Sequence, residues 1–194
     1  GEGLIRAVAA CSRVPVIKHY KGICSVYLDG DCDPDKAVAV TVNSKTQRTG
    51  VCNAMETLLV DAAVADKLLP RVSDQLKSKN VELRVDERAA AILGPDAKPA
   101  TREDWDTEFL DLICTVRVVD GVEGALEHIG HHGSGHTETI VTENEATALR
   151  FQNEADASTV FWNASTRFSD GGEFGMGAEI GISTDKIGAR GPMG

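Results

Sequence analysis

The sequence predicts an α/β fold in which a mostly parallel sheet has helices on both faces. Short apolar runs alternate with amphipathic stretches along nearly the whole chain, which is the βαβαβ rhythm of a parallel sheet. The chain has 194 residues, of which 42% are hydrophobic and 26% charged. It is therefore long enough for one sizeable core, and its composition is that of a folded protein rather than a disordered one.

The apolar runs are predicted to be the strands of this sheet. They are residues 14–17, 25–28, 57–60, 81–85, 113–119, 139–141 and 159–162. Active sites in open parallel sheets gather beyond the carboxyl ends of the strands, so we expect the functional site at that edge.

The helices are predicted from their caps and their amphipathic pattern. Asp33 followed by Pro34 indicates a helix start, because aspartate caps a helix and proline suits the first turn. This helix is expected to end near Lys45. Further helices are expected from Asp61, with a kink at Pro70, from a cap at Asp120 to about Gly133, and over 145–154. Residues 94–99 are interpreted as a surface loop, and 171–194 are glycine-rich without a strong period.

Charge and composition exclude several classes of function. The net charge is −10 and no stripe of lysine and arginine occurs, which argues against nucleic-acid binding. No apolar run approaches the roughly 18–20 residues of a membrane helix.

The first residues carry neither a start methionine nor a signal-peptide pattern, so the chain is interpreted as a piece that begins partway through a longer protein. Five cysteines, an odd number without a CxxC pair, indicate reduced thiols and a cytoplasmic location.

Cys52 is the thiol whose surroundings suggest chemistry. It lies between a predicted helix end and a predicted strand, among polar residues and Gly50, whereas Cys11 and Cys114 lie within apolar runs. With Lys45 and Arg48 nearby, a partly exposed thiol can have a lowered pKa. The alternative is that Cys52 is an inert small hydrophobe. If Cys52 is reactive, it should be alkylated before Cys11 and Cys114.

Several blocks of sequence resemble one enzyme family. They are residues 12–19, 45–48, 51–60, 133–138, 163–168, 181–186 and 189–194. Together, and in this order, they resemble the gamma-glutamyl phosphate reductase family of the aldehyde dehydrogenase superfamily. The resemblance implies an aldehyde dehydrogenase-type catalytic domain over 23–180. Residues 1–22 would then end an otherwise missing cofactor-binding domain, and 181–194 would return toward that domain.

The resemblance also implies a reaction and a cofactor. The Cys52 thiolate would attack L-glutamyl 5-phosphate, releasing phosphate and leaving a thioester. NADPH would then reduce the thioester to L-glutamate 5-semialdehyde, in proline biosynthesis. The backbone N–H of Cys52 would stabilise the developing oxyanion. Glu108 resembles the glutamate that binds the nicotinamide ribose, with an ordinary solvated carboxylate as the alternative.

His19 marks a difference from the oxidative members of the superfamily. Those enzymes have a glutamate that activates water for thioester hydrolysis, and alignment places His19 at or near its position. An enzyme that exchanges its thioester with phosphate gains from lacking such a base. Slow hydrolysis of the acyl-enzyme is therefore expected.

Ser165, Thr166, Arg167 and His136 are the predicted substrate-binding residues. A guanidinium fork with two hydroxyls suits a phosphate or a carboxylate, and the resemblance implies that residues 165–167 line the substrate pocket. It also implies that His136 and Glu138 border this pocket. The alternative for 165–167 is a surface turn.

No metal site is expected. His128, His131, His132 and His136 match no zinc spacing. Residues 175–181 have one residue too many for a dinucleotide-binding fingerprint.

Two other functions remain open from the sequence. One is an oxidative aldehyde dehydrogenase acting on another small aldehyde, which would not depend on phosphate. The other is a non-catalytic domain that keeps the fold for assembly. A small-molecule substrate, no nucleic acid, no membrane and a homo-oligomeric full-length protein are the expected partners.

Overall fold

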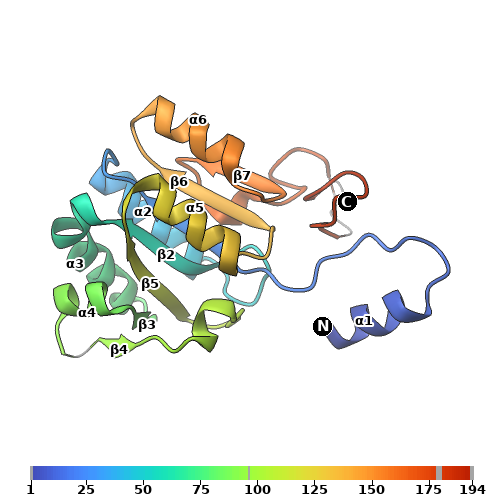
Figure 1. The fold of residues 1–194 in the computed structure, drawn as a ribbon, viewed down its shortest axis with the longest axis horizontal. Coiled ribbons are helices and arrows are strands. Elements are labelled where there is room, and N and C mark those ends of the chain that lie inside the picture. The colour runs from blue at the N-terminus through green and yellow to red at the C-terminus, as the bar shows by residue number, and fades with distance from the viewer. Residues whose placement is uncertain (1, 96, 178–180, 193–194) are drawn as a thin grey trace.

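A computed structural model describes residues 2–95, 97–177 and 181–192. Its main feature is a seven-stranded sheet in the order β4-β3-β5-β2-β1-β6-β7, in which every neighbouring pair is parallel. The predicted α/β fold with a mostly parallel sheet is therefore confirmed (Figure 1). The strands are β1 Cys24–Leu28, β2 Met55–Asp61, β3 Glu82–Val85, β4 Lys98–Pro99, β5 Ile113–Val119, β6 Thr137–Val141 and β7 Thr159–Trp162.

Helices cover both faces of the sheet, and each face has its own apolar core (Figure 1). Alternate residues of a strand point to opposite faces, so Val26 and Leu28 of β1 belong to one core and Tyr27 to the other. The first core is closed by α2 Pro34–Thr46, α3 Ala62–Ser78 and α4 Glu87–Leu93. The second is closed by α5 Gly121–His132 and α6 Glu145–Glu154.

The helix starts follow the capping residues in the sequence. The Asp33 side chain accepts hydrogen bonds from the backbone N–H groups of Asp35 and Lys36, and Pro34 occupies the first turn of α2 as predicted. Helix α3 continues through Pro70 to Ser78. The predicted cap at Asp120 is wrong in one respect: the residue precedes α5, but its carboxylate binds Arg88 instead of the helix backbone.

The amino-terminal part differs most from the prediction. Residues 14–17 were expected to form a buried strand, but Val14 and Ile17 are 71% and 53% exposed. They belong to a strap, residues 12–23, that joins α1 Glu2–Cys11 to β1 without regular secondary structure. Pro15 offers no N–H to a ladder, so this apolar run makes a poor strand. Helix α1 stands apart from the sheet (Figure 1), and none of its residues is buried.

Some elements were not predicted. Helix α4 and the 3-10 turns η1 Glu103–Asp106 and η2 Thr166–Phe168 are short, and β4 occupies part of the expected loop 94–99. The carboxyl-terminal segment contains an antiparallel bridge between Ser183 and Gly191. The domain boundary expected at 180, part of the glycine-rich stretch 175–181, and the end of the matching block 189–194 lie outside the described residues. Within the described ranges, no helix combines the length and apolar character needed to cross a membrane.

Candidate active site

The candidate site lies where three neighbouring strands begin. Strand β1 pairs with β2 on one side and β6 on the other. Cys52 is on the loop that leads into β2, His136 directly precedes β6, and His19 is on the strap ahead of β1. The expectation of a site at the carboxyl ends of the strands is wrong for Cys52, which lies at the amino ends.

Polar side chains at the carboxyl ends of the central strands form a hydrogen-bonded network. The Tyr27 hydroxyl lies 3.0 Å from a carboxylate oxygen of Asp29 and 2.9 Å from one of Asp61. The Thr142 hydroxyl donates to the other Asp29 oxygen over 2.6 Å. These four side chains are therefore hydrogen-bonded to one another at the edge of the sheet opposite Cys52.

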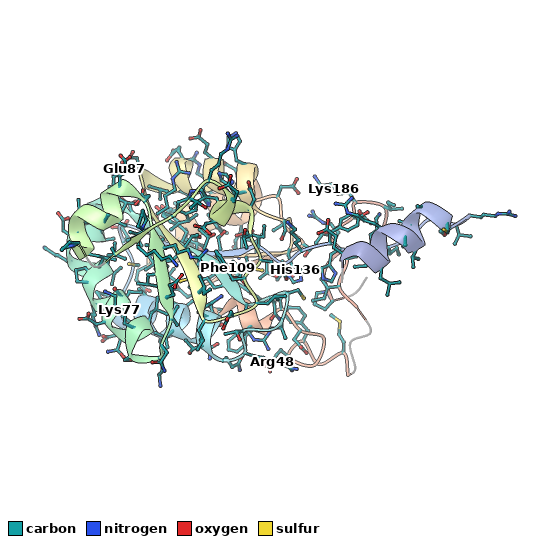
Figure 2. All side chains as sticks on the ribbon, turned by 90° about the horizontal axis from the view of Figure 1, so that it is seen from below. Arg48, Lys77, Glu87, Phe109, His136 and Lys186 are labelled. Carbon is teal, nitrogen blue, oxygen red and sulfur yellow. The ribbon has the colours of Figure 1, made fainter. Side chains whose placement is uncertain are left out.

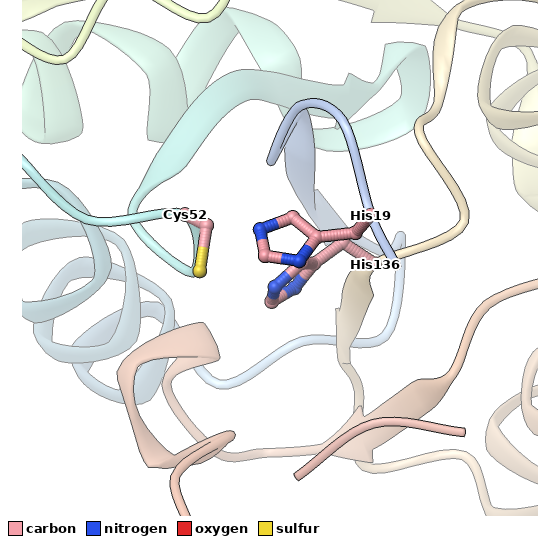
Figure 3. Close-up of side chains that lie close together, drawn as sticks. All are labelled: His19, Cys52 and His136. Atoms are coloured by element: carbon pink, nitrogen blue, oxygen red, sulfur yellow. The ribbon is translucent and has the colours of Figure 1, made fainter. Parts of the chain in front are cut away.

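His19, Cys52 and His136 form a compact cluster. Their ligand atoms, one from each side chain, all lie within 4.8 Å of one another, and Figure 3 shows the three side chains gathered together. Cys52 and His19 are half-buried, whereas His136 is fully buried. The partial exposure expected of Cys52 is therefore observed. In Figure 2, His136 lies on the part of the body nearest α1.

The proton position on His19 follows from its hydrogen bond. Its Nδ1 lies 2.7 Å from the carbonyl oxygen of Ile182. A carbonyl can only accept, so Nδ1 carries the proton and Nε2 of the neutral ring has a lone pair. His19 can therefore accept a proton from a thiol. Lys18 holds the same part of the strap, because its ammonium binds Asp185 over 3.0 Å.

His136 is held in the neutral form by its surroundings. Burial, and to a lesser degree the nearby His19, lowers the pKa of His136 to about 3. Its Nδ1 lies 2.9 Å from the Thr137 hydroxyl and 3.7 Å from the Cys24 sulfur. Among the described residues, its buried Nε2 has no hydrogen-bond partner. Such a nitrogen is available to a group that enters the site.

Gly22 and Glu108 position the Cys52 backbone. A Cβ at Gly22 would lie 1.8 Å from the Cys52 carbonyl oxygen, so only glycine allows this close approach. The Gly22 N–H donates to the Glu108 carboxylate over 3.0 Å. Glu108, expected to bind the cofactor ribose, is half-buried. It is linked to the Cys52 backbone through Gly22.

The remaining cysteines have distinct environments. Cys24 lies beneath Cys52 and its thiol donates to the Cys52 carbonyl oxygen over 3.2 Å. Burial raises the pKa of Cys24 well above its usual value and that of Cys114 to about 12. Burial also raises the pKa of Cys32 to about 11. Cys11 lies in an apolar run, as noted from the sequence, but it is exposed on α1.

The basic residues near Cys52 are arranged differently from the expectation. Lys45 is fully buried and binds Glu56 over 2.8 Å, so its charge is committed to that carboxylate. Arg48 is exposed and, in Figure 2, lies at the lower edge of the body. Burial lowers the pKa of half-buried Arg167, the charge of Asp170 opposes this shift, and the charges of Arg48 and Cys52 have smaller effects. Arg167 is therefore a half-buried guanidinium within electrostatic range of both Asp170 and Cys52.

The three predicted substrate-binding residues of η2 have different surroundings. The Ser165 hydroxyl lies 3.1 Å from that of Ser44 and accepts from the Arg167 N–H over 3.2 Å. Thr166 is buried, and its N–H donates to the Ser44 hydroxyl over 3.2 Å. These contacts fix the turn, and the Nε of half-buried Arg167 is buried without a hydrogen-bond partner among the described residues. Arg167 is thus the member of the three with a side chain suited to a ligand.

Two further polar residues at this edge have defined partners. Glu138, which the resemblance groups with His136 at the border of the substrate pocket, is fully buried; its carboxylate accepts from the Ser25 N–H over 2.9 Å, and burial raises its pKa to about 8. Asn53, which was not predicted, donates an amide N–H to the Ser169 carbonyl over 2.9 Å.

Of the four histidines considered as zinc ligands, His128, His131 and His132 lie on α5, whereas His136 precedes β6. His128 is buried with its Nδ1 2.9 Å from an Arg117 nitrogen, and His132 binds Asp106 over 2.8 Å. Among the described residues, the group of ligand side chains close enough to hold a metal is instead His19, Cys52 and His136.

Comparisons with known proteins show which proteins the chain resembles in sequence and in fold. No protein-family model matches it. It is 56% identical over 194 residues to the gamma-glutamyl phosphate reductase of a Nitratiruptor species, covering 100% of this chain and 47% of that protein. It is 58% identical over 197 residues to that of Anaeromyxobacter dehalogenans, covering 100% of this chain and 46% of that protein.

Solved structures agree with the sequence comparison. The crystal structure of gamma-glutamyl phosphate reductase from Thermotoga maritima matches with a TM-score of 0.96 and 49% identity, over 99% of this chain and 46% of that one. An acetylating aldehyde dehydrogenase from Geobacillus thermoglucosidasius shares the fold, with a TM-score of 0.70 and 22% identity over 98% of this chain and 50% of that one. The chain spans about half the length of the curated relatives it matches. Over its whole length the chain is thus similar in sequence to about half of each of these gamma-glutamyl phosphate reductases, and it shares an aldehyde dehydrogenase-like fold.

Proposed function

We propose that the protein containing this chain reduces L-glutamyl 5-phosphate to L-glutamate 5-semialdehyde and phosphate with NADPH, as a step of proline biosynthesis, through a thioester on Cys52. The observation that carries the proposal is the half-buried Cys52 thiol in a cluster with His19, whose Nε2 is the ring nitrogen without a proton. The names of the relatives supply the substrate and the class of oxidoreductase.

The first step is activation of the thiol. His19 Nε2 accepts the proton of Cys52, and the resulting imidazolium keeps its Nδ1 hydrogen bond to the Ile182 carbonyl. The thiolate attacks the acyl carbon, the bond to the phosphate oxygen breaks, and phosphate leaves with the electron pair. The carbonyl oxygen becomes negative on the way, and the Cys52 backbone N–H is the donor that this chain offers to it.

Arg167 and His136 are assigned to the substrate. Arg167 is half-buried, and the charge of Cys52 acts on it, so its guanidinium can hold the phosphate or the carboxylate of a substrate bound at the sulfur. The neutral His136, with its unpartnered Nε2, borders the same place. Ser165 and Thr166 contribute mainly by fixing the turn that carries Arg167.

Glu108 fits a contact with the cofactor. One of its oxygens accepts from Gly22 N–H, and a carboxylate has acceptor capacity on both oxygens, so it can also bind a sugar hydroxyl. Glu108 is linked to the Cys52 backbone through Gly22, so a ribose bound to this carboxylate would lie near Cys52. A bound nicotinamide cofactor would supply the hydride that reduces the thioester. Collapse of the reduced adduct returns the Cys52 thiolate.

His19 also accounts for retention of the acyl group. Once it has taken the thiol proton, its imidazolium has no lone pair with which to activate water. We therefore expect slow thioester hydrolysis, and glutamate release should be slow when cofactor and phosphate are withheld.

The test is to replace Cys52 in the protein containing this chain. Cys52→Ser should lower the rate of phosphate-dependent oxidation of glutamate 5-semialdehyde about 10³-fold or more, since the nucleophile is lost. Cys32→Ser is the matched control, because Cys32 is half-buried and follows the carboxyl end of β1, on the far edge of the sheet. Mass spectrometry of the protein incubated with the acyl phosphate should detect a glutamyl adduct on Cys52.

The two alternatives give different results. An oxidative aldehyde dehydrogenase would oxidise its aldehyde without phosphate, and Cys52→Ser would still be inactive. A non-catalytic assembly domain would leave the rate unchanged in Cys52→Ser. Either result would reject the proposal.

A further inference from the structure

We propose that His19, Cys52 and His136 form a binding site for a thiophilic divalent cation of the Zn²⁺ type, and that a cation bound there reversibly blocks the Cys52 sulfur. The reductase proposal assigns no metal to this chain, so the inference goes beyond it. The carrying observation is the convergence of two imidazoles and one thiol from three separate segments of the chain (Figure 3).

The set of ligands suits such a cation. Imidazole nitrogens and thiolate sulfur are both zinc ligands, and three protein ligands leave the fourth tetrahedral position open to water or another ligand. In a tetrahedral site with bonds of about 2.0–2.3 Å, the ligand atoms are about 3.3–3.7 Å apart. The three atoms here already lie within 4.8 Å of one another. Small rotations of the half-buried His19 and Cys52 side chains can provide the remaining approach.

Each of the two imidazoles has a ring nitrogen that could bind a metal. His19 donates Nδ1–H to the Ile182 carbonyl, the arrangement that orients metal-binding histidines and leaves Nε2 as the ligand. The His136 Nε2 is buried and, among the described residues, has no hydrogen-bond partner.

The neighbouring charges set limits on the affinity. Binding releases the Cys52 proton to solvent and forms a metal–sulfur bond, with no change of oxidation state. The Arg167 guanidinium, whose charged neighbours are Asp170, Arg48 and Cys52, repels a cation. This charge favours reversible binding over a permanent structural metal.

Co²⁺ is the probe for the test, because it binds to zinc-type sites and its coordination by a thiolate gives an absorption band. Co²⁺ added to the protein containing this chain should produce a thiolate-to-metal absorption band that saturates at one equivalent, and Zn²⁺ should abolish the band by displacement. Cys52→Ser should remove the band. His19→Ala should raise the Kd at least about tenfold. His136 is fully buried and its removal endangers folding, so it is not used as a variant.

The controls are His131→Ala and Cys11→Ser, which replace an exposed histidine and an exposed cysteine. Both should keep the band and its midpoint. A band that survives in Cys52→Ser, an unchanged Kd in His19→Ala, or no band at millimolar Co²⁺ would overturn the inference. The measurement needs no turnover, so its failure would leave the reductase proposal standing.

Discussion

The Lys45 ammonium and the Glu56 carboxylate lie 2.8 Å apart, with the two side chains 0% and 1% exposed. Lys45 is in the last turn of α2 and Glu56 is in β2, so this buried pair joins the two ends of the loop that carries Cys52. Burial raises the pKa of Glu56 to about 7, while the charge and hydrogen bond of Lys45 oppose the rise. The pair thus fixes the loop at the site.

Lys45→Met should destabilise the protein by about 3–5 kcal/mol, because it leaves a buried carboxylate without its partner. The free energy of unfolding in urea measures the effect. Lys36→Met is the control, since Lys36 and Glu143 form an exposed pair that is worth about 0–1 kcal/mol. Equal losses in the two variants would show that the buried pair has no special role.

Gly22→Ala should displace the Cys52 backbone. The added Cβ would lie 1.8 Å from the Cys52 carbonyl oxygen, a distance that forces the loop or the strap to move. We expect a large loss of activity and a changed rate of Cys52 alkylation. Gly50→Ala, on the same loop, has no atom within 4 Å of its new Cβ and should behave like the unaltered protein.

Glu138 should make stability fall as pH rises. Its pKa is raised from 4.5 to about 8, so between these values the folded state holds a proton that the unfolded state has lost. Stability is therefore fully retained below about pH 4.5 and declines toward pH 8, by at most about 1.4 kcal/mol per pH unit. Unfolding measured between pH 5 and 8 should show a weaker decline in Glu138→Gln, and an unchanged slope would assign the effect elsewhere.

Alkylation should separate the cysteines by exposure. Cys11 is exposed and Cys52 half-buried, so both should react with a mild reagent, whereas Cys24 and Cys114 are fully buried and should resist. Peptide mass spectrometry after short treatment reports each site. The expected priority of Cys52 over Cys114 stands as a prediction, but exposure of Cys11 makes comparison with that residue uninformative. Rapid labelling of Cys24 would contradict the packing at the start of β1.

Arg167→Gln should weaken binding of the phosphate substrate. A charge-assisted hydrogen bond is worth about 1.5–3 kcal/mol, which corresponds to a roughly tenfold to hundredfold rise in the KM for phosphate in the oxidative direction. Arg71→Gln is the matched control, because Arg71 pairs with Asp35 on an exposed surface. A KM that changes equally in both variants would remove Arg167 from the substrate site.

The central sheet was predictable from sequence because its signals are local. The helix beginning at Pro34 and the strand 113–119 follow from capping residues and apolar runs within a few positions. The location of the site was not predictable in this way. Proximity of His19 to His136 depends on the pairing of β1 with β6, which joins distant parts of the chain. The strand expected at 14–17 failed because an apolar run does not reveal whether a partner strand is available.

The strap contributes His19 from outside the sheet, while Cys52 and His136 are attached to strands within it. Detachment of the strap would therefore separate the base from the nucleophile without unfolding the core. Loss of catalytic competence should precede loss of secondary structure during gradual denaturation, and the temperature at which the enzyme inactivates should fall below its melting temperature.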